Sequence, residues 1–450
     1  MLSKEDNEAL TRVGPGTLMG NLFRRFWLPA VLTKEVEKPD CPPVRLRILG
    51  EDLLAFRDTQ GRVGIVEAYC SHRRAPLYMG RNEDCGLRCA YHGWKFDVDG
   101  KCVDLPNINT TRDITMIRQR MSIVAYPTRE VNGVVWVYMG PADKMPEMPV
   151  FEWMSLPADQ VHVSRWLQRS NYMQGVEGEI DTSHISFLHK DFDRDHSALK
   201  ERGADLAAVD GAPELTLREN EQGFTYGARR VVQGKQFWRV TQWMAPMYSL
   251  IPTSLGTTFT TGGGRAWVPV DDDNVTTFSF GFRADRPFNE QELAVFAEGK
   301  LFPPRMKAGS IQLQQGHKID TFLPLANKEN EFLLDREMQR TVNFTGIVGA
   351  NEQDRSLQEW MPADRPGGGV VDRSKEHLVA SDIAIVTARR QLLKLARDLA
   401  QGIEPVAAQQ GSLYAVRAIS RTCDHADYDS FLQEYGDDLF VPGATEPATQ

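Results

Sequence analysis

Two short pairs of cysteine and histidine stand in the first quarter of the chain. Cys70 and His72 form the first pair, and after a gap of sixteen residues Cys89 and His92 form the second. Two thiolates and two imidazoles hold either a tetrahedral zinc ion or a [2Fe–2S] cluster with both histidines on one iron. Only one residue separates Cys70 from His72, which is closer than the usual spacing of zinc ligands and weighs against zinc.

A second set of potential ligands follows further along, in the stretch Asp181-Thr-Ser-His184-Ile-Ser-Phe-Leu-His189. Five positions along an ideal helix turn a side chain by about 140°. Both histidines therefore reach one metal ion only if the helix breaks or distorts between them. Asp181 and His184 are three positions apart and share a helix face. Taken alone, histidines at this spacing are more often solvated or hydrogen-bonded than bound to metal.

The first pattern, Cys-x-His and then Cys-x-x-His-Gly-Trp, is similar to the cluster motif of the Rieske non-haem iron oxygenases at every ligand position. The resemblance implies that Cys70 and Cys89 hold one iron and that His72 and His92 hold the other. Neutral imidazoles in place of thiolates lower the negative charge on the cluster and raise its reduction potential.

In the same family, an Asp-x-x-His-x-x-x-x-His segment after the cluster domain supplies two ligands of a mononuclear Fe(II). By this resemblance His184 and His189 bind that iron, and Asp181 is the carboxylate that bridges the two metal sites. The usual third ligand is a downstream aspartate, and Asp354 fits that position and its surrounding pattern best. Two histidines and one carboxylate leave coordination positions open for dioxygen beside a substrate.

From the residues alone, other side chains compete with Asp354 for the third position. Glu352 and Glu359 flank it in the sequence. The others come directly after the histidine segment: Asp191, Asp193, Asp195 and His196. The choice of Asp354 therefore rests on the resemblance.

The resemblance extends over nearly the whole chain. Residues 7–17, 69–77 and 335–345 look like the phthalate 4,5-dioxygenase group, which uses oxygenase subunits of one kind and acts mainly on aromatic carboxylates. One departure stands out, because many family members carry an Asn six or seven residues before the first iron histidine. Gly178 and Glu177 occupy those positions, so no weak Asn contact to the iron is expected.

An aromatic carboxylate requires an apolar slot for the ring and a cation for the carboxylate, and arginine suits that group best. Arg239 lies in an expected strand, residues 236–243, where alternation puts it on one face with Phe237 and Trp243. Arg202 follows the iron segment in a polar stretch that could close over it. A surface or ion-paired arginine is the competing interpretation of both.

Short strands and turns are expected to position the cysteine and histidine pairs. Period-two alternation and turn residues favour small antiparallel sheets. The expected strands cover residues 44–48, 53–56, 63–66 and 134–139. Chain-breaking Gly and Pro residues between 140 and 149 indicate a domain boundary. We therefore predict a Rieske domain with an N-terminal extension over 1–145 and a catalytic domain over 146–450.

The second domain mixes both kinds of element. Helices are expected over 171–190 and 382–400. Antiparallel strands are expected over residues 224–232, 235–243, 266–270 and 275–282. Glycine triplets at 262–264 and 367–369 lack the Lys-Ser/Thr of a phosphate loop and are expected in flexible loops. The predicted fold class is α+β, with an all-β Rieske domain and an antiparallel catalytic sheet flanked by helices.

Composition excludes several other classes of protein. With 450 residues, 41% of them hydrophobic, the chain is globular, and its net charge of −9 offers no basic footprint for nucleic acid. No apolar run approaches the ~20 residues that span a bilayer, and the acidic start is unlike a signal peptide. Six cysteines are too few for a disulfide framework. A cytoplasmic protein is expected.

The function that the resemblance implies is oxygenation of an aromatic carboxylate with O₂, most similar to phthalate 4,5-dioxygenase cis-dihydroxylation. Electrons would pass from an NADH-dependent flavin and iron–sulfur reductase to the cluster and then to Fe(II). A homotrimer, or a hexamer of stacked trimers, would place His92 beside Asp181 of the adjacent subunit. The alternatives are a Rieske monooxygenase or O-demethylase, and a non-catalytic electron-transfer or zinc-binding protein.

Overall fold

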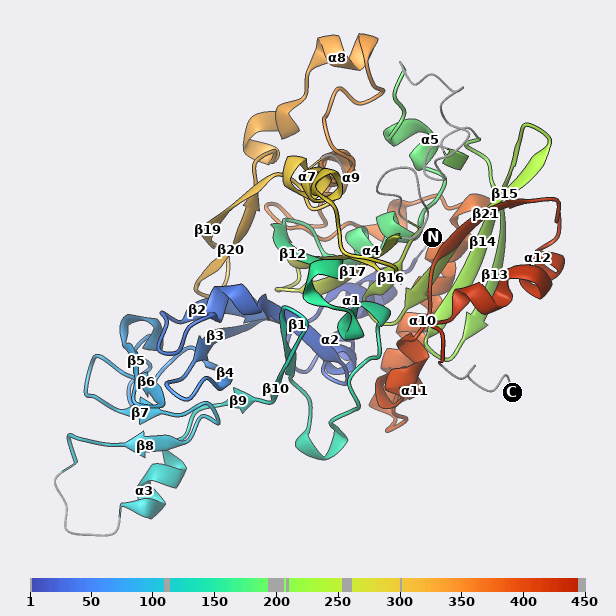
Figure 1. Cartoon of the computed structure of the whole chain (residues 1–450). Coiled ribbons are helices and arrows are strands. Elements are labelled where there is room, and N and C mark those ends of the chain that lie inside the picture. Colours follow the sequence, from blue (N-terminus) through green and yellow to red (C-terminus); the bar gives the residue numbers. More distant parts are fainter. Residues whose placement is uncertain are drawn as a thin grey trace.

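The computed structural model describes residues 2–108, 114–192, 206–207, 210–252, 261–299 and 302–443. It consists of a small all-β part and a larger part in which helices surround one antiparallel sheet (Figure 1). The predicted α+β fold class is thereby confirmed. Within the described ranges, none of the helices has the length and apolar character that a membrane crossing requires.

Two four-stranded antiparallel sheets form the small part. Alternate residues of β2 are buried, namely Val44, Leu46 and Ile48, as the sequence pattern predicts for a strand. The first sheet runs in the order β2 (Val44–Ile48), β3 (Glu51–Arg57), β4 (Val63–Glu67) and β9 (Ala125–Tyr126). The second runs in the order β5 (Arg81–Glu83), β6 (Gly86–Arg88), β7 (Lys95–Phe96) and β8 (Cys102–Asp104).

A three-stranded sheet connects the two parts of the molecule. Its order is β1 (Trp27–Leu32), β11 (Val134–Tyr138) and β10 (Thr128–Val131). Every residue of β11 is buried, in one hydrophobic core that also contains the larger sheet. The cysteines of the two pairs lie in a separate, smaller core. The domain boundary after residue 145 stays a prediction.

The larger part is built on an eight-stranded antiparallel sheet. Its strands are β12 (Val161–Gln168), β18 (Val275–Arg283), β17 (Thr261–Pro269), β16 (Tyr248–Leu250), β15 (Lys235–Met244), β14 (Gly223–Val232) and β13 (Glu214–Asn220), with β21 (Ile419–Cys423) also paired to β15. Gln233 and Gly234 connect β14 to β15 with φ of 51° and 79°. Positive φ at both positions is typical of a tight hairpin, so this predicted turn is confirmed.

The prediction of a loop at the first glycine triplet is wrong, because Gly262 lies inside β17 opposite Phe282 of β18. A Cβ atom at Gly262 would lie 1.9 Å from the Phe282 ring. The aromatic ring occupies the space over the glycine, which keeps this stretch in the sheet. The second triplet begins at Gly367 with φ of 72° and does lie outside regular structure.

The helices of the chain lie around this sheet, apart from α3, which lies beside β8 in the small part (Figure 1). They are α1 (Lys4–Thr11), α2 (Leu18–Phe23), α3 (Thr115–Arg120), α4 (Tyr172–Ile180), α5 (Ile185–Leu188), α7 (Glu290–Glu298), α8 (Arg336–Thr341), α9 (Ala350–Gln358), α10 (Ile383–Ala400), α11 (Val406–Gln409) and α12 (Tyr428–Tyr435). A hairpin of β19 (Met306–Gln312) and β20 (Lys318–Pro324) completes the chain. The helix predicted over 382–400 is α10, whereas the one predicted over 171–190 is divided into α4 and α5.

Helix α4 is held against the sheet by a close contact and a buried ion network. A Cβ atom at Gly175 would lie 2.2 Å from the Trp267 ring, so only glycine permits this approach. Arg373 donates two hydrogen bonds of 2.9 Å to the Glu177 carboxylate, and Arg389 donates a third of 2.7 Å. Glu177, where the sequence departs from the resembling pattern, thus fixes the helix.

Candidate functional site

Each cysteine and histidine pair lies on a turn that closes on itself. The Cys70 N–H donates to the carbonyl of Ala75 at 2.9 Å, and the Cys89 N–H donates to the carbonyl of Trp94 at 2.8 Å. Gly93, with φ of 76°, permits the second turn and donates back to the Cys89 carbonyl. These backbone hydrogen bonds stabilise the two turns.

The four side chains are arranged as a pair of thiols and a pair of imidazoles. Cys70 and Cys89 are buried, and burial raises the pKa of the Cys70 thiol to about 11. The rings of His72 and His92 have their centroids 4.6 Å apart, and the His72 ring stacks on Trp94. The Nδ1 atom of His72 is buried with no hydrogen-bond partner. An unpaired ring nitrogen there fits a metal ligand.

The spacing of the four donors distinguishes between zinc and a cluster. Around one tetrahedral zinc ion, ligand atoms lie roughly 3.3–3.8 Å from one another, given metal–ligand bonds of 2.0–2.3 Å. Only one group of His, Cys, Asp and Glu ligand atoms within the described ranges gathers inside 4.8 Å, and the cysteine pairs are not in it. The wider arrangement disfavours a single zinc ion and fits a cluster of two irons.

That one group is His184, His189 and Asp354. Helix α4 ends at Ile180, and Asp181 then accepts a hydrogen bond of 2.8 Å from the Ser183 N–H. His184 directly precedes the one-turn helix α5 and His189 directly follows it. The interruption between α4 and α5 lies before His184, so no break separates the two histidines. Instead, the helix ends after one turn and His189 has non-helical φ and ψ, and the two Nε2 atoms lie 3.3 Å apart.

Asp354 reaches the same point from α9. Its Oδ1 lies 3.2 Å from Nε2 of His189 and 3.6 Å from Nε2 of His184. Burial raises the pKa of Asp354, but His189, His184 and Arg265 together outweigh burial, and the pKa lies below its usual value. Two imidazoles and one carboxylate on one side of a point are the donor set of a facial iron site.

Hydrogen bonds behind the ligands orient both rings. The Gln353 side-chain N–H donates to the carbonyl of Ile347 at 2.9 Å, which turns its oxygen toward Nδ1 of His189 at 2.6 Å. His189 therefore carries its proton on Nδ1 and leaves Nε2 free for a metal. Asp181 stands in the same relation to His184, with Oδ2 3.5 Å from Nδ1. Sequence reasoning missed Gln353, since nothing but its place beside Asp354 marks it.

The described competitors for the third position point elsewhere. Glu352 accepts a hydrogen bond from the Arg305 N–H at 3.3 Å, and Glu359 pairs with Arg355 at 2.9 Å. Asp191 is not in the group either. The remaining predicted residues lie outside the described residues: Asp193, Asp195 and His196, together with Arg202.

As predicted, Arg239 shares a face of β15 with Phe237 and Trp243. This face is turned toward the α4–α5 junction. On the paired strand β14, the Tyr226 hydroxyl donates to the carbonyl of Ile180 at 2.9 Å, at the end of α4. Arg239 is buried, and Nη1 donates to the Thr241 hydroxyl at 3.2 Å. Among the described residues, no carboxylate forms an ion pair with it.

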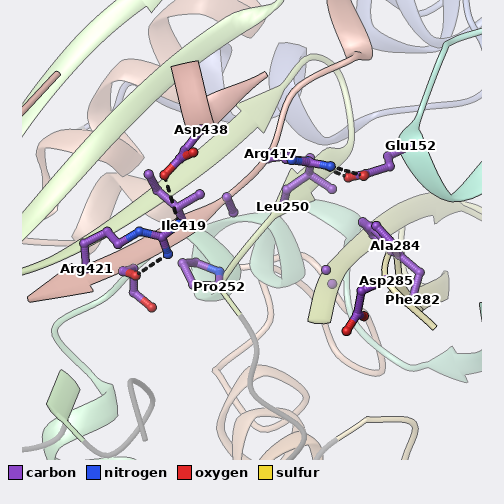
Figure 2. Close-up of a pocket in the computed structure, with 14 residues that line it drawn as sticks. Glu152, Leu250, Pro252, Phe282, Ala284, Asp285, Arg417, Ile419, Arg421 and Asp438 are labelled. Carbon is purple, nitrogen blue, oxygen red and sulfur yellow. Dashed lines mark hydrogen bonds and ion pairs between the residues drawn. The ribbon is translucent and has the colours of Figure 1, made fainter. Parts of the chain in front are cut away.

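A cavity of about 310 Å³ lies at another part of the sheet, beside the ends of β16, β17 and β21. Ion pairs of Arg417 with Glu152 and of Arg421 with Asp438 line it (Figure 2). None of the candidate iron ligands lines this cavity. It is therefore separate from the candidate iron site.

Comparisons with known proteins identify the family of the chain. Residues 26–122 match the Rieske [2Fe-2S] domain family, and residues 137–425 match the LigXa C-terminal domain like family. The chain is 37% identical to the phthalate 4,5-dioxygenase oxygenase subunit of Pseudomonas putida, over 87% of this chain and 86% of that one. It is 35% identical to the 3-chlorobenzoate-3,4-dioxygenase oxygenase subunit of Comamonas testosteroni, over 88% of this chain and 89% of that one.

Among solved structures, NdmA of Pseudomonas putida CBB5 with caffeine has the same fold. Its TM-score is 0.57 at 16% identity, and the match covers 91% of this chain and 100% of that one. The family matches exclude the non-catalytic interpretation, and they assign a Rieske cluster and mononuclear iron as cofactors. The chain therefore belongs to the Rieske non-haem iron oxygenases, as an oxygenase subunit.

Proposed function

We propose that the chain is the cytoplasmic oxygenase component of a system that adds both atoms of O₂ to the ring of an aromatic carboxylate, as phthalate 4,5-dioxygenase does. The supporting observation is Arg239, a buried guanidinium without a carboxylate partner among the described residues, facing the α4–α5 junction. A buried charge without a counter-ion is costly. A carboxylate on the substrate would remove that cost.

In this proposal the mononuclear iron is held by His184, His189 and Asp354. The cluster is held by Cys70 and three further ligands. Those ligands are Cys89, His72 and His92. When bound, the iron supplies dioxygen activation and the cluster supplies single electrons. The chain's own part is to fix the ligands and position the ring. Gln353 and Asp181 fix the two iron-site imidazoles, and Arg239 orients the substrate through its carboxylate.

We further propose a homotrimer, or a hexamer of stacked trimers, that receives electrons from an NADH-dependent flavin and iron–sulfur reductase. In Figure 1 the sheet β5–β8 and helix α5 lie at opposite ends of the molecule. Electron transfer to iron would therefore come from a neighbouring subunit, through a contact of His92 with Asp181. Large apolar side chains are exposed at both ends, Tyr91 near the cluster and Phe187 in α5, at 56% and 59%. Exposed aromatic groups of this kind favour an interface.

The type of oxygenation is tested with labelled dioxygen. Turnover of phthalate under ¹⁸O₂ with a compatible reductase should place two labelled atoms in a cis-dihydrodiol. Mass spectrometry of the product measures this. One labelled atom, or loss of a methyl group from a methoxybenzoate, would instead identify a monooxygenase or O-demethylase on the same residues.

Cys70→Ala should abolish the Rieske absorption and EPR spectra, because a buried thiol ligand of the cluster is lost. Cys102→Ala is the matched control, since Cys102 is also buried in the same small core but lies outside the motif. Iron and acid-labile sulfide are measured in both proteins. An intact cluster in Cys70→Ala would contradict the assignment.

Asp354→Ala should lose the mononuclear iron and turnover while the Rieske spectrum remains, since the two sites share no ligand. Glu352→Gln is the control on the same helix: burial raises the pKa of Glu352 to about 7, so an amide is a mild replacement. Metal analysis with the cluster absorbance as internal reference measures the loss. Retained iron in Asp354→Ala would point to another ligand.

Asp181→Asn should keep both metals and bind substrate normally, yet lower turnover roughly 10- to 100-fold, as expected when an outer-shell partner of a metal ligand is replaced. Reoxidation of the reduced cluster, followed by stopped-flow absorbance, should slow by the same factor. Sedimentation should show a trimer or hexamer. Full turnover by a monomer at the assay concentration would refute the intersubunit route.

A further inference from the structure

Two arginines stand next to each other on the β14–β15 hairpin. Arg230 is paired across the strands with Phe237, and Arg239 is paired with Ala228. Directly opposed residues of an antiparallel pair share a face, and so do residues two positions apart in one strand. Arg230 and Arg239 are therefore diagonal neighbours on the face that meets the α4–α5 junction.

These two arginines differ from every other buried arginine that the structure describes. Six buried arginines form an ion pair with a buried or half-buried glutamate. They are Arg165 with Glu35, Arg265 with Glu179, Arg283 with Glu292, Arg355 with Glu359, and Arg373 and Arg389 with Glu177. Arg230 and Arg239 are only 1% and 7% exposed, and within the described ranges neither forms an ion pair.

Neutral partners satisfy only part of each guanidinium. Arg230 donates from Nε to the carbonyl of Asp210 and from Nη2 to the carbonyl of Thr182, both at 2.9 Å. Its Nη1 is buried with no hydrogen-bond partner. Arg239 has the single hydrogen bond to Thr241. Several N–H groups of the two arginines thus remain available to one acceptor.

The electrostatics of the pair are unfavourable without an anion. Burial and the nearby charge of Arg239 lower the pKa of Arg230 to about 10, so Arg230 remains cationic at neutral pH. Asp181 and Asp210 attract Arg230, and Glu179 attracts Arg239, but all three described carboxylates act from beyond ion-pair distance. Two adjacent buried cations are costly, and a carboxylate between them would offset desolvation and mutual repulsion together.

The position of the pair indicates what that anion is. Thr182, whose carbonyl accepts from Arg230, lies in the short segment that connects α4 to His184. An anion held by the two arginines would therefore lie beside the candidate iron site. We propose that Arg230 and Arg239 together form one subsite for a carboxylate of the aromatic substrate, and that Arg230 determines the preference for anionic substrates. This inference rests on the proposed function.

Arg230→Gln in the iron-loaded, full-length oxygenase should weaken binding of phthalate roughly 10- to 100-fold, the loss expected for one charge-assisted hydrogen bond. Benzoate should be affected too, whereas the uncharged dimethyl phthalate should bind nearly as before. Arg239→Gln should behave in the same way. Isothermal calorimetry measures all three ligands, and cluster absorbance with thermal melting reports the integrity of each variant.

Arg229→Gln is the matched control. Arg229 is adjacent in sequence but on the other face of β14, where it pairs with Glu214 and Gln236. The Arg229→Gln variant should bind phthalate, benzoate and dimethyl phthalate as the unmodified protein does. Arg230→Lys keeps the charge and covers the case in which Arg230→Gln does not fold. It should retain part of the selectivity for acid over ester.

The outcomes separate the two proposals. If Arg230→Gln, or Arg230→Lys where the first does not fold, weakens acid and ester equally or matches Arg229→Gln, then Arg230 supports the fold and the inference is overturned. The proposed function survives that result when Arg239→Gln still loses the acids selectively. If the unmodified protein binds neither phthalate nor benzoate, or prefers the ester, the proposed function itself fails.

Discussion

The candidate iron site depends on an interruption between two helices. His184 lies just after this interruption, and the single turn α5 separates it from His189. An ideal helix would turn the two side chains about 140° apart, but α5 ends at Leu188 and His189 has non-helical φ and ψ, and the Nε2 atoms lie 3.3 Å apart. The interruption positions the following segment only if α4 itself is held firmly against the sheet. Gly175 allows that helix to contact Trp267 closely, and Glu177 ties it to two arginines. These contacts hold α4, and with it the point from which the segment carrying Asp181 and His184 leaves the helix.

The sequence predicted the parts of this fold whose causes are local. The β14–β15 hairpin follows from its alternation and its Gln-Gly turn, and the ligand pairs follow from spacing. Asp354 has no local signature, because α9 meets α5 only through tertiary packing; its choice needed a family resemblance. Gly262 was misassigned to a loop because the ring that covers it comes from Phe282 on another strand. Arg230 was overlooked although the predicted hairpin register already places it diagonal to Arg239.

Buried arginines serve two purposes in this molecule, and pairing distinguishes them. Where a glutamate lies within ion-pair distance, as Glu177 does for Arg373, both charges are compensated and the ion pair fixes helices to the sheet. Breaking such a pair leaves an uncompensated buried charge, so it acts as a structural tie. Among the described residues no carboxylate lies within ion-pair distance of Arg239, and Glu179 attracts it only from further away, so a ligand anion would offset a cost that the fold leaves in place. The same residue type therefore supports the fold in one place and selects ligands in another.

Asp181 has capacity for a partner beyond its own chain. Its Oδ1 accepts from the Ser183 N–H, and its Oδ2 lies 3.5 Å from His184. A carboxylate has about four acceptor positions, so these contacts leave some unused, and the side chain is 26% exposed. The helix interruption thus presents, at the surface, a carboxylate already held against an iron-site imidazole. An imidazole N–H from another subunit would meet an acceptor whose orientation is set in advance, and so would lose little freedom on binding.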